Sequence, residues 1–330
     1  MTQPTLTVAM SVYNGARFLE SAIASVCAQT FTDFEFLILD DGSTDQSAAI
    51  VARAAGRDSR IRPILRENRG LVASLNQLLA EARAPLVARM DADDLCLPER
   101  FAKQIGFLAG HPDHGVIGTF TRDIDQHGAE YPSSGADHPV SHADFVANIE
   151  RHGPLLAHPS VIYRRDVVLA AGGYHGAFRH CEDFDLWLRL AHRTCIANLP
   201  ERLLQYRHYA DQVSNRHAVE QQTGVAIARL AYAERQAGRP DPTEHLTALP
   251  AVDDLDDLFG REGVAKEVRG AIARSLIYSP YALSGSGFDL LLRHVEEGGS
   301  GRALWLTVPR LVRFGKPHRA ARLAAALART

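Results

Sequence analysis

The sequence predicts a doubly wound α/β fold, in which helices cover both faces of a mostly parallel sheet. Short apolar runs of strand length alternate with segments whose apolar residues recur at helical spacing, and this unit repeats four times within residues 6–108. Each strand is separated from the next by enough chain for a helix, which favours parallel pairing. The helical composition of residues 219–330 predicts a helical C-terminal extension beyond the α/β domain.

The first two units lie before residue 56. Leu6 to Ser11 is expected to be a buried strand, and apolar residues from Phe18 to Val26 recur at helical spacing after a polar turn. Phe34 to Leu39 is a second apolar run. It ends at an acidic segment whose Ser and Thr side chains suit the start of a helix over Gln46 to Ala55.

The third and fourth units follow without a break. Ile61 to Leu65 is expected to be a strand and Leu71 to Ala82 a helix. Leu86 to Met90 is expected to be the next strand, and the proline that begins Pro98 to Leu108 suits a helix N-terminus.

The alternation ends after a short apolar run at Val116 to Thr119. Residues 120–155 are rich in Gly, Pro, His and Asp, so we expect an irregular insertion suited to a binding loop. Regular structure is expected to resume with a strand at Ser160 to Tyr163 and helices at Arg165 to Ala171 and Asp183 to Ala191.

Composition and charge narrow the partners and the location. The net charge of −3 gives no overall field that would attract nucleic acid, and four cysteines without C-x-x-C spacing favour reduced thiols. The N-terminus lacks a basic and apolar leader, and no stretch approaches the ~20 apolar residues of a membrane span. We therefore expect a cytoplasmic protein. The change to helical composition predicts a domain boundary near residue 218, between an α/β domain at 1–218 and a helical region at 219–330.

Polar residues follow three of the predicted strands. Ser11 and Tyr13 follow the first, Asp41 the second, and Asp91 and Asp93 the fourth. The carboxyl ends of parallel strands meet at one edge of a sheet, where ligands collect. Each residue also has a structural explanation, since Asp and Ser cap helices and Tyr packs, but their convergence favours a ligand site.

The triplet Asp91-Ala92-Asp93 is one of four D-x-D triplets in the chain, so the pattern alone is weak evidence. Its position after a strand is what distinguishes it. Residues two apart in an extended loop point the same way, and paired carboxylates suit Mg²⁺ or Mn²⁺.

Several segments, taken in order, resemble the signature of family 2 inverting glycosyltransferases with the Rossmann-like GT-A fold. The resemblance covers roughly residues 5–215, and the matching segments are Val8 to Gly15, Asp33 to Phe36, Asp40 to Asp45, Asn68 to Asn76, Asp91 to Asp94, Gly172 to Tyr174, Glu182-Asp183 and Trp187 to Arg189.

The resemblance implies a nucleoside-diphosphate-sugar donor. Tyr13 would lie against the base with Ser11 beside it, and Asp41 would accept a hydrogen bond from the base imide, for which uracil, and so UDP, is the usual partner. Asp91 would approach the ribose or the metal, and Asp93 would hold a Mn²⁺ or Mg²⁺ ion that bridges the phosphates.

The chemistry of the transfer requires a base for the incoming hydroxyl. Asp183 is the candidate from the resemblance, with Glu182 as positioning partner or alternate base; the structural alternative is that both merely complement a helix N-terminus. Arg207 could reach the diphosphate and His208 could complete the metal shell. Equally, Arg207 could pair with a structural carboxylate and His208 could be a surface residue.

The C-terminal region carries no motif that can be tied to chemistry. Residues 302–329 combine basic side chains with apolar ones and contain no acid, which suits either an anionic membrane surface at the inner face of the membrane or packing on this or another subunit, as in a homo-oligomer. The acceptor is expected to be a saccharide or a lipid-linked saccharide.

Two other functions share parts of this pattern. A sugar-phosphate nucleotidyltransferase would favour a Gly-rich phosphate loop after the first strand, where this chain has Gly15 alone. A non-catalytic nucleotide-sugar-binding subunit would be expected to lack the metal carboxylates or the base, and all of these are present.

Overall fold

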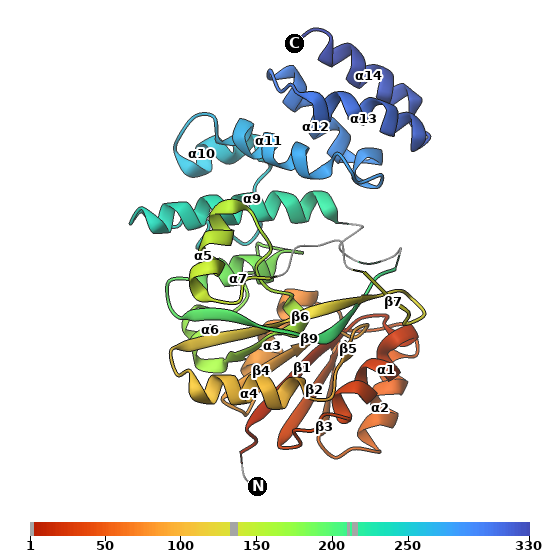
Figure 1. The fold of residues 1–330 in the computed structure, drawn as a ribbon, viewed down its shortest axis with the longest axis vertical. Helices are drawn as coiled ribbons and strands as arrows, with labels where there is room; N and C mark the ends of the chain where they lie inside the picture. The colour runs from red at the N-terminus through yellow and green to blue at the C-terminus, as the bar shows by residue number, and fades with distance from the viewer. Residues whose placement is uncertain (1–2, 133–137, 210–211, 213–216) are drawn as a thin grey trace. The chain divides into compact units, whose positions relative to one another are not determined.

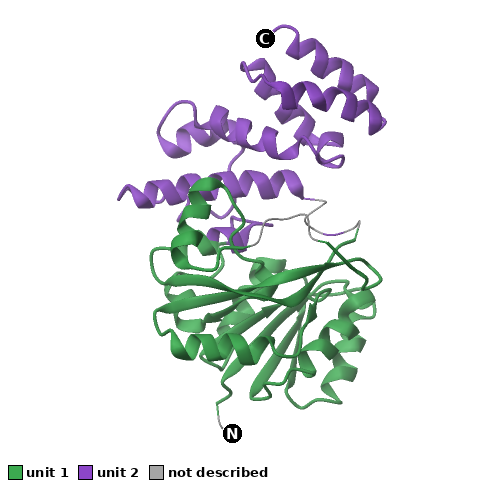
Figure 2. Cartoon of the chain, viewed as in Figure 1, with its two compact units in different colours: residues 1–175, 186–209 green, residues 176–185, 210–330 purple. Residues whose placement is uncertain are grey.

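The computed structural model describes residues 3–132, 138–209, 212 and 217–330. The chain divides into two compact units, which Figure 2 colours separately. Unit 1 comprises residues 1–175 and 186–209, and unit 2 comprises residues 176–185 and 210–330. The catalytic-domain boundary near residue 218 stays a prediction.

Unit 1 contains a nine-stranded sheet with the order β3-β2-β1-β4-β8-β6-β9-β5, in which β7 pairs with β6 (Figure 1). The strands are β1 (Leu6–Val12), β2 (Phe34–Asp40), β3 (Ile61–Leu65), β4 (Leu86–Met90), β5 (Leu95–Cys96), β6 (His114–Ile124), β7 (Glu130–Tyr131), β8 (Ile162–Arg164) and β9 (Cys195–Arg207).

Most of the long strands run in one direction. β1, β2, β3 and β4 pair in parallel, as do β6 and β9, while β8 is antiparallel to both β4 and β6. The four parallel strands and the β6–β9 pair therefore present their carboxyl ends at the same edge. The strand order reverses between β1 and β4, and ligands of such sheets bind at this switch point.

The predicted helices of this part of the chain are present, with ends within a few residues of the expected ones (Figure 1). They are α1 (Ala16–Cys27), α2 (Ser47–Ala55), α3 (Leu71–Glu81), α4 (Arg100–Gly110), α6 (Arg165–Ala170) and α7 (Glu182–Leu190). The structure adds α5 (His142–Arg151) and the 3-10 turn η1 (His158–Ser160), which were not predicted. The mostly parallel α/β fold is thus confirmed.

The prediction of an irregular insertion over residues 120–155 is wrong in three places. β6 continues to Ile124, β7 occupies residues 130–131, and α5 occupies residues 142–151; residues 133–137 lie outside the described part. β6 extends because it pairs along its length with β9, a strand that the sequence pattern did not predict. The apolar Phe120 and Ile124 are buried by this pairing region, so tertiary burial outweighs the local turn residues.

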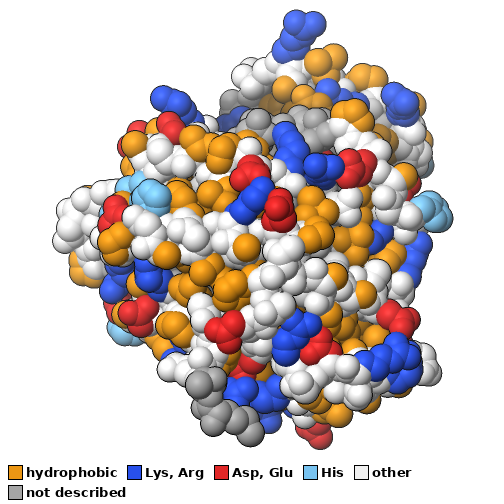
Figure 3. All heavy atoms as spheres, turned by 60° about the horizontal axis from the view of Figure 1, so that its bottom comes forward, with side chains coloured by type: hydrophobic (Ala, Val, Ile, Leu, Met, Phe, Trp, Pro, Cys, Tyr) orange, Lys and Arg blue, Asp and Glu red, His pale blue; other side chains and the backbone are white. Residues whose placement is uncertain are grey.

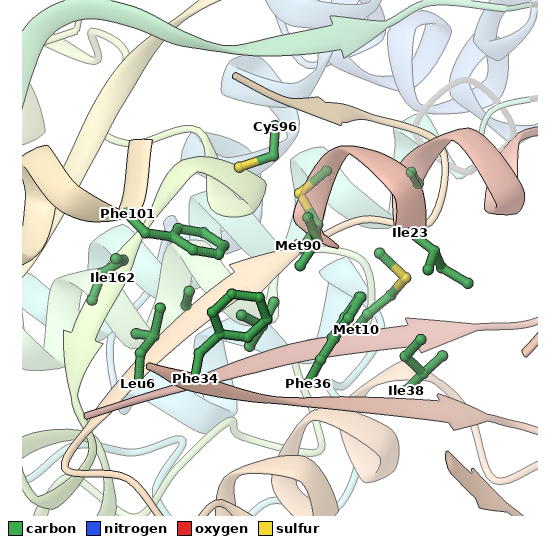
Figure 4. Packing of buried hydrophobic residues seen from close by; sticks show 14 of the residues in the cluster. Leu6, Met10, Ile23, Phe34, Phe36, Ile38, Met90, Cys96, Phe101 and Ile162 are labelled. Carbon is green, nitrogen blue, oxygen red and sulfur yellow. The ribbon is translucent and has the colours of Figure 1, made fainter. Parts of the chain in front are cut away.

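The core of unit 1 lies between the sheet and the helices that cover one face. Leu6, Val8, Met10 and Val12 alternate along β1 and all enter this core, which Figure 4 shows. The rings of Phe34 and Phe101 meet edge to face with centroids 5.8 Å apart. Because both faces of the sheet are covered, β1 and β2 are almost continuously buried, which explains their unbroken apolar runs.

Gly42 allows the loop after β2 to pass close to the loop after β3. Its φ is +79°, and a Cβ there would lie 2.7 Å from the backbone nitrogen of Asn68. Gly172 has a similar φ of +85° but open space around it. A side chain at position 172 would therefore cause backbone strain alone, whereas a side chain at position 42 would cause both strain and a steric clash.

We expect Gly42→Ala to lower the free energy of unfolding by about 3 kcal/mol and Gly172→Ala by about 1 kcal/mol. Urea denaturation of both variants and the parent measures the difference. Equal losses for the two variants would contradict the close approach at Gly42.

Unit 2 is helical in its described residues, which confirms the predicted C-terminal extension. It contains α9 (Ala218–Gln236), η2 (Val252–Asp254), α10 (Leu255–Phe259), α11 (Val264–Leu276), η3 (Ala282–Ser284), α12 (Ser286–Glu296), α13 (Arg302–Arg313) and α14 (Pro317–Leu327). A separate apolar core joins α11 to α14 through residues such as Phe288, Leu311 and Leu323.

Charge and hydropathy agree with the sequence-based expectations. Basic and acidic side chains are interspersed over the face drawn in Figure 3, as suits a net charge of −3. Among the described residues, no helix combines the length and apolar character needed to cross a bilayer.

Candidate active site

The loops that follow β1 and β2 are hydrogen-bonded to each other at the carboxyl edge of the sheet. Asn14 has a left-handed φ of 52°; its amide donates to Ser43 Oγ at 2.9 Å, and its Oδ1 accepts from the Thr44 amide at 2.8 Å. Tyr13, just before Asn14, is 54% exposed, while Ser11 is half-buried in β1. The joined loops thus hold Tyr13 in solvent at the switch point.

Asp41 is held rigidly below these loops. It is buried, and its Oδ1 accepts from the Arg66 guanidinium at 2.8 Å and the Arg69 amide at 3.0 Å. Its Oδ2 accepts from the Gly70 amide at 2.8 Å. A carboxylate oxygen can accept two hydrogen bonds, so Oδ2 retains acceptor capacity while the carboxylate is fixed in orientation.

Three carboxylates gather directly after β4. Oxygen atoms of Asp91, Asp93 and Asp94 lie within 4.8 Å of one another, a spacing that could hold a metal ion. Arg89, at the end of β4, pairs with Asp91 and is itself buried. The structure therefore brings together the two predicted metal carboxylates and adds Asp94, which was not among the predicted metal ligands.

The electrostatics of this acidic group favour a bound cation. Burial, with a contribution from the charge of Asp91, raises the pKa of Asp93 to about 6. Burial, followed by the negative charges of Asp93 and Asp91, raises the pKa of Asp94 well above its usual range. Within the described residues, Asp94 Oδ2 is buried without a hydrogen-bond partner, so a cation would supply the missing contact.

Arg207, at the end of β9, is hydrogen-bonded to the loop that carries the acidic group. Its amide donates to Asp94 Oδ1 at 2.8 Å and its Nε to the Asp93 carbonyl at 2.7 Å, while the guanidinium also packs over the Phe18 ring. Arg207 is buried. These contacts favour a role for Arg207 in positioning the loop that carries Asp93 and Asp94. A direct contact between Arg207 and the diphosphate stays a prediction.

His208 was predicted to complete the metal shell, but its side chain contacts Asp123 in the structure. Its Nε2 lies 3.0 Å from Asp123 Oδ1, and its ring lies near Tyr131 and Tyr206. Among the described residues, the acidic group that could hold a metal ion does not include His208. Metal ligation by His208 stays a prediction.

Tyr209 is a site residue that the sequence did not indicate. Its hydroxyl donates to Asp93 Oδ2 at 2.8 Å, and its ring packs against Phe18 with centroids 5.2 Å apart. Burial and then the charge of Asp93 raise the pKa of Tyr209, so the hydroxyl keeps its proton and can donate. In the sequence, the one indication of a role for Tyr209 was that it directly follows Arg207 and His208.

Glu182 and Asp183 begin α7, as predicted, and both belong to unit 2. Asp185 adds a third acid to the first turn, and such acids interact favourably with a helix N-terminus. The role of Asp183 or Glu182 as a base stays a prediction. Trp187, further along α7, is buried, which favours core packing over a place in an acceptor cleft.

A second group of potential ligands lies elsewhere. Asp113, His114 and Cys195 come together at the amino ends of β6 and β9, at the opposite edge of the sheet from the acidic group. Its nitrogen and sulfur donors differ from the all-oxygen set that Mg²⁺ and Mn²⁺ prefer. The acidic group is therefore the candidate active site.

Comparison with known proteins shows which family the chain is similar to. The model of the family described as glycosyl transferase family 2 matches residues 7–170. The chain is similar to the amylovoran biosynthesis glycosyltransferase AmsE of Erwinia amylovora, with 34% identity over 70% of this chain and 87% of the relative. It is also similar to the O-antigen biosynthesis glycosyltransferase WbnJ of Escherichia coli, with 30% identity over 61% of this chain and 79% of the relative.

Solved structures share the fold at lower identity. The mannosyltransferase PcManGT from Pyrobaculum calidifontis, in complex with GDP-Man and Mn²⁺, has a TM-score of 0.55 and 18% identity over 99% of this chain and 86% of its own. S. aureus TarS 1-349 in complex with UDP-GlcNAc has a TM-score of 0.57 and 16% identity over 98% of this chain and 88% of its own.

Proposed function

Because the chain belongs to glycosyl transferase family 2 and has the GT-A fold, we propose that it is an inverting, metal-dependent glycosyltransferase. Its donor is a nucleoside-diphosphate sugar, with UDP as the nucleotide. Its acceptor is a hydroxyl of a saccharide or lipid-linked saccharide, and the transfer belongs to polysaccharide or glycoconjugate biosynthesis, as the names of AmsE and WbnJ suggest.

The observation that carries the proposal is the acidic group after β4. Asp91 and Asp93 would hold the cation, and the unpartnered Oδ2 of Asp94 and the raised pKa of Asp93 both indicate a site that lacks positive charge. The all-oxygen donor set suits Mn²⁺ or Mg²⁺. When bound, the ion supplies positive charge to the diphosphate leaving group.

The nucleotide would lie at the β1–β4 switch point. The exposed ring of Tyr13 offers a stacking surface for the base, with Ser11 beside it. The fixed carboxylate of Asp41 would accept the imide N–H of uracil through Oδ2, which has acceptor capacity left. Asp91 would also approach the ribose. Cytosine lacks that imide N–H, so UDP is the preferred nucleotide over CDP.

The transfer itself needs one proton acceptor. The acceptor oxygen forms a bond to the anomeric carbon from the face opposite the diphosphate, and the bond from that carbon to the diphosphate oxygen breaks with its electron pair on the leaving group. The hydroxyl proton passes to the carboxylate of Asp183, or to Glu182 if that residue is the base. Attack from the opposite face inverts the anomeric configuration.

A donor panel tests the proposal. The protein is incubated with UDP-, GDP-, CDP- and dTDP-sugars and Mn²⁺, and nucleoside diphosphate release is measured. We expect slow hydrolysis of one UDP-sugar, which disappears with EDTA. Pyrophosphate formation from a nucleoside triphosphate and a sugar phosphate would instead indicate a nucleotidyltransferase, and donor binding without turnover for any acceptor would indicate a non-catalytic subunit.

Tyr209→Phe tests the support of Asp93. Removal of the hydroxyl that orients this carboxylate should raise the apparent Kd for Mn²⁺ roughly 10-fold, as for other residues that orient metal ligands. Mn²⁺ titration of donor turnover measures this Kd. Tyr131→Phe, an exposed tyrosine of β7, is the matched control and should leave the Kd unchanged. Equal Kd values for Tyr209→Phe and the parent would contradict the orienting role.

A further inference from the structure

α13 has two apolar faces, and unit 2 covers one of them. Leu304, Thr307 and Leu311 are buried, and the two leucines belong to the apolar core shared with α12 and α14. On the remaining surface of α13, Trp305 is 47%, Leu306 44% and Val312 55% exposed. A helix that served only to pack in this bundle would carry polar residues there.

The exposed face is bordered by positive charge. Arg302 and Arg313 are exposed at the two ends of α13, and in the part of the chain that the structure describes neither forms a salt bridge. The segment from α13 to the C-terminus contains no acid, and its basic residues are Arg302, Arg310, Arg313, Lys316, Arg319, Arg322 and Arg329. Arg310 packs over the ring of Tyr278, which is 66% exposed.

We propose that this face of α13, formed by Arg302, Trp305, Leu306, Val312 and Arg313, binds the surface of an anionic lipid bilayer. The apolar side chains enter the boundary between head groups and acyl chains, and the guanidinium groups contact lipid phosphates. Trp suits this boundary because its ring is apolar and its N–H remains hydrogen-bonded to head groups or water.

Charge and size favour a bilayer over other partners. A twofold contact between two copies through this face would place arginines of one copy against those of the other, and like charges in contact are unfavourable. A helix of this length spans only about 18 Å, and its one face is smaller than the roughly 800 Å² per partner of a stable protein interface. An interfacial helix needs no larger surface, since lipids surround each side chain.

Vesicle binding tests the inference without donor or acceptor, so its result is independent of the transferase proposal. The full chain is sedimented with vesicles of phosphatidylcholine alone and with vesicles that also contain phosphatidylglycerol. We expect binding to the anionic vesicles that weakens with added salt, and little binding to the neutral ones. Failure to bind anionic vesicles at low salt overturns the proposal.

Tryptophan fluorescence locates the contact. The chain has two tryptophans, of which Trp187 is 1% and Trp305 47% exposed. A blue shift on addition of anionic vesicles, with quenching by lipids brominated along the acyl chain, therefore reports entry of Trp305 into the bilayer. Sedimentation without either spectral change would place the contact elsewhere and overturn the assignment to α13.

Two double variants separate the apolar and basic contributions. Trp305→Ser with Val312→Ser, and Arg302→Gln with Arg313→Gln, should each weaken binding to anionic vesicles roughly 10-fold or more. All four residues are exposed, so circular dichroism and melting should match the parent. The matched controls in unit 1 are Leu169→Ser and the double variant Arg53→Gln with Arg57→Gln, which should bind like the parent.

Analytical ultracentrifugation without lipid distinguishes the other occupants. A parent dimer that becomes monomeric in the Trp305 and Val312 variant would identify a second copy of the chain as the partner and overturn the proposal. Unchanged vesicle binding by both double variants would do the same.

Discussion

Asp93→Asn is expected to lower the rate of sugar transfer roughly 10³-fold or more, because a Lewis acid at the leaving group is worth about 4 kcal/mol. Asn preserves the size of the side chain and can still accept the hydrogen bond from Tyr209, so the main change is the loss of a charged oxygen ligand. Titration calorimetry should show donor binding that no longer depends on Mn²⁺, and nucleoside diphosphate release measures the rate.

Asp254→Asn is the matched control for Asp93→Asn. Asp254 belongs to another D-x-D triplet, is exposed, and lies in unit 2 at the start of α10. Its substitution should leave both the rate and the metal dependence unchanged. Metal-dependent donor binding that persists in Asp93→Asn would refute the ligand assignment, even if the rate fell.

Asp183→Asn is expected to lower kcat roughly 10²- to 10⁴-fold, the range typical of general-base removal. The apparent Kd for the donor and for Mn²⁺ should stay close to the parent values, because the proposed base contacts the acceptor and not the donor phosphates. Transfer to acceptor and donor binding must therefore be measured separately, by product chromatography and by calorimetry.

Glu182→Gln decides between the two neighbouring acids. If Asp183 is the base, Glu182→Gln should change kcat far less than Asp183→Asn does. A larger loss in Glu182→Gln would move the base to Glu182, and near-parental kcat in both variants would leave these acids with only the structural role of complementing the N-terminus of α7.

The sequence predicted the first half of the fold well because the relevant signals are local. The apolar runs at Leu6–Val12 and Phe34–Asp40 and the helical spacing between them depend only on residues a few positions apart. The same reasoning failed for the end of β6, where Gly, Pro, His and Asp residues suggested irregular chain, and it did not predict β9. These strands form because they pair with each other over a sequence separation of about 80 residues, which no local window contains.

Within the candidate site, Asp91 and Asp93 were predicted to lie together because residues two apart in an extended loop point the same way, and their place after a strand predicted the carboxyl edge of the sheet. The partners of these carboxylates were not predictable in this way. Tyr209 reaches Asp93 across 116 residues, and Arg207 turns its guanidinium toward the Asp93 carbonyl. Both contacts depend on where the end of β9 lies in the sheet.

The sequence by itself thus determined the alternation of strands and helices, the helical C-terminal region and the acidic residues at the carboxyl edge, because each follows from spacing within a short segment. Only the tertiary structure decided that Asp94 joins the acidic group with an oxygen that has no hydrogen-bond partner among the described residues, that Asp41 is fixed by Arg66, and that α13 leaves Trp305 exposed. These features depend on which distant segments fill the space around a side chain, and burial of that kind is a property of the folded chain.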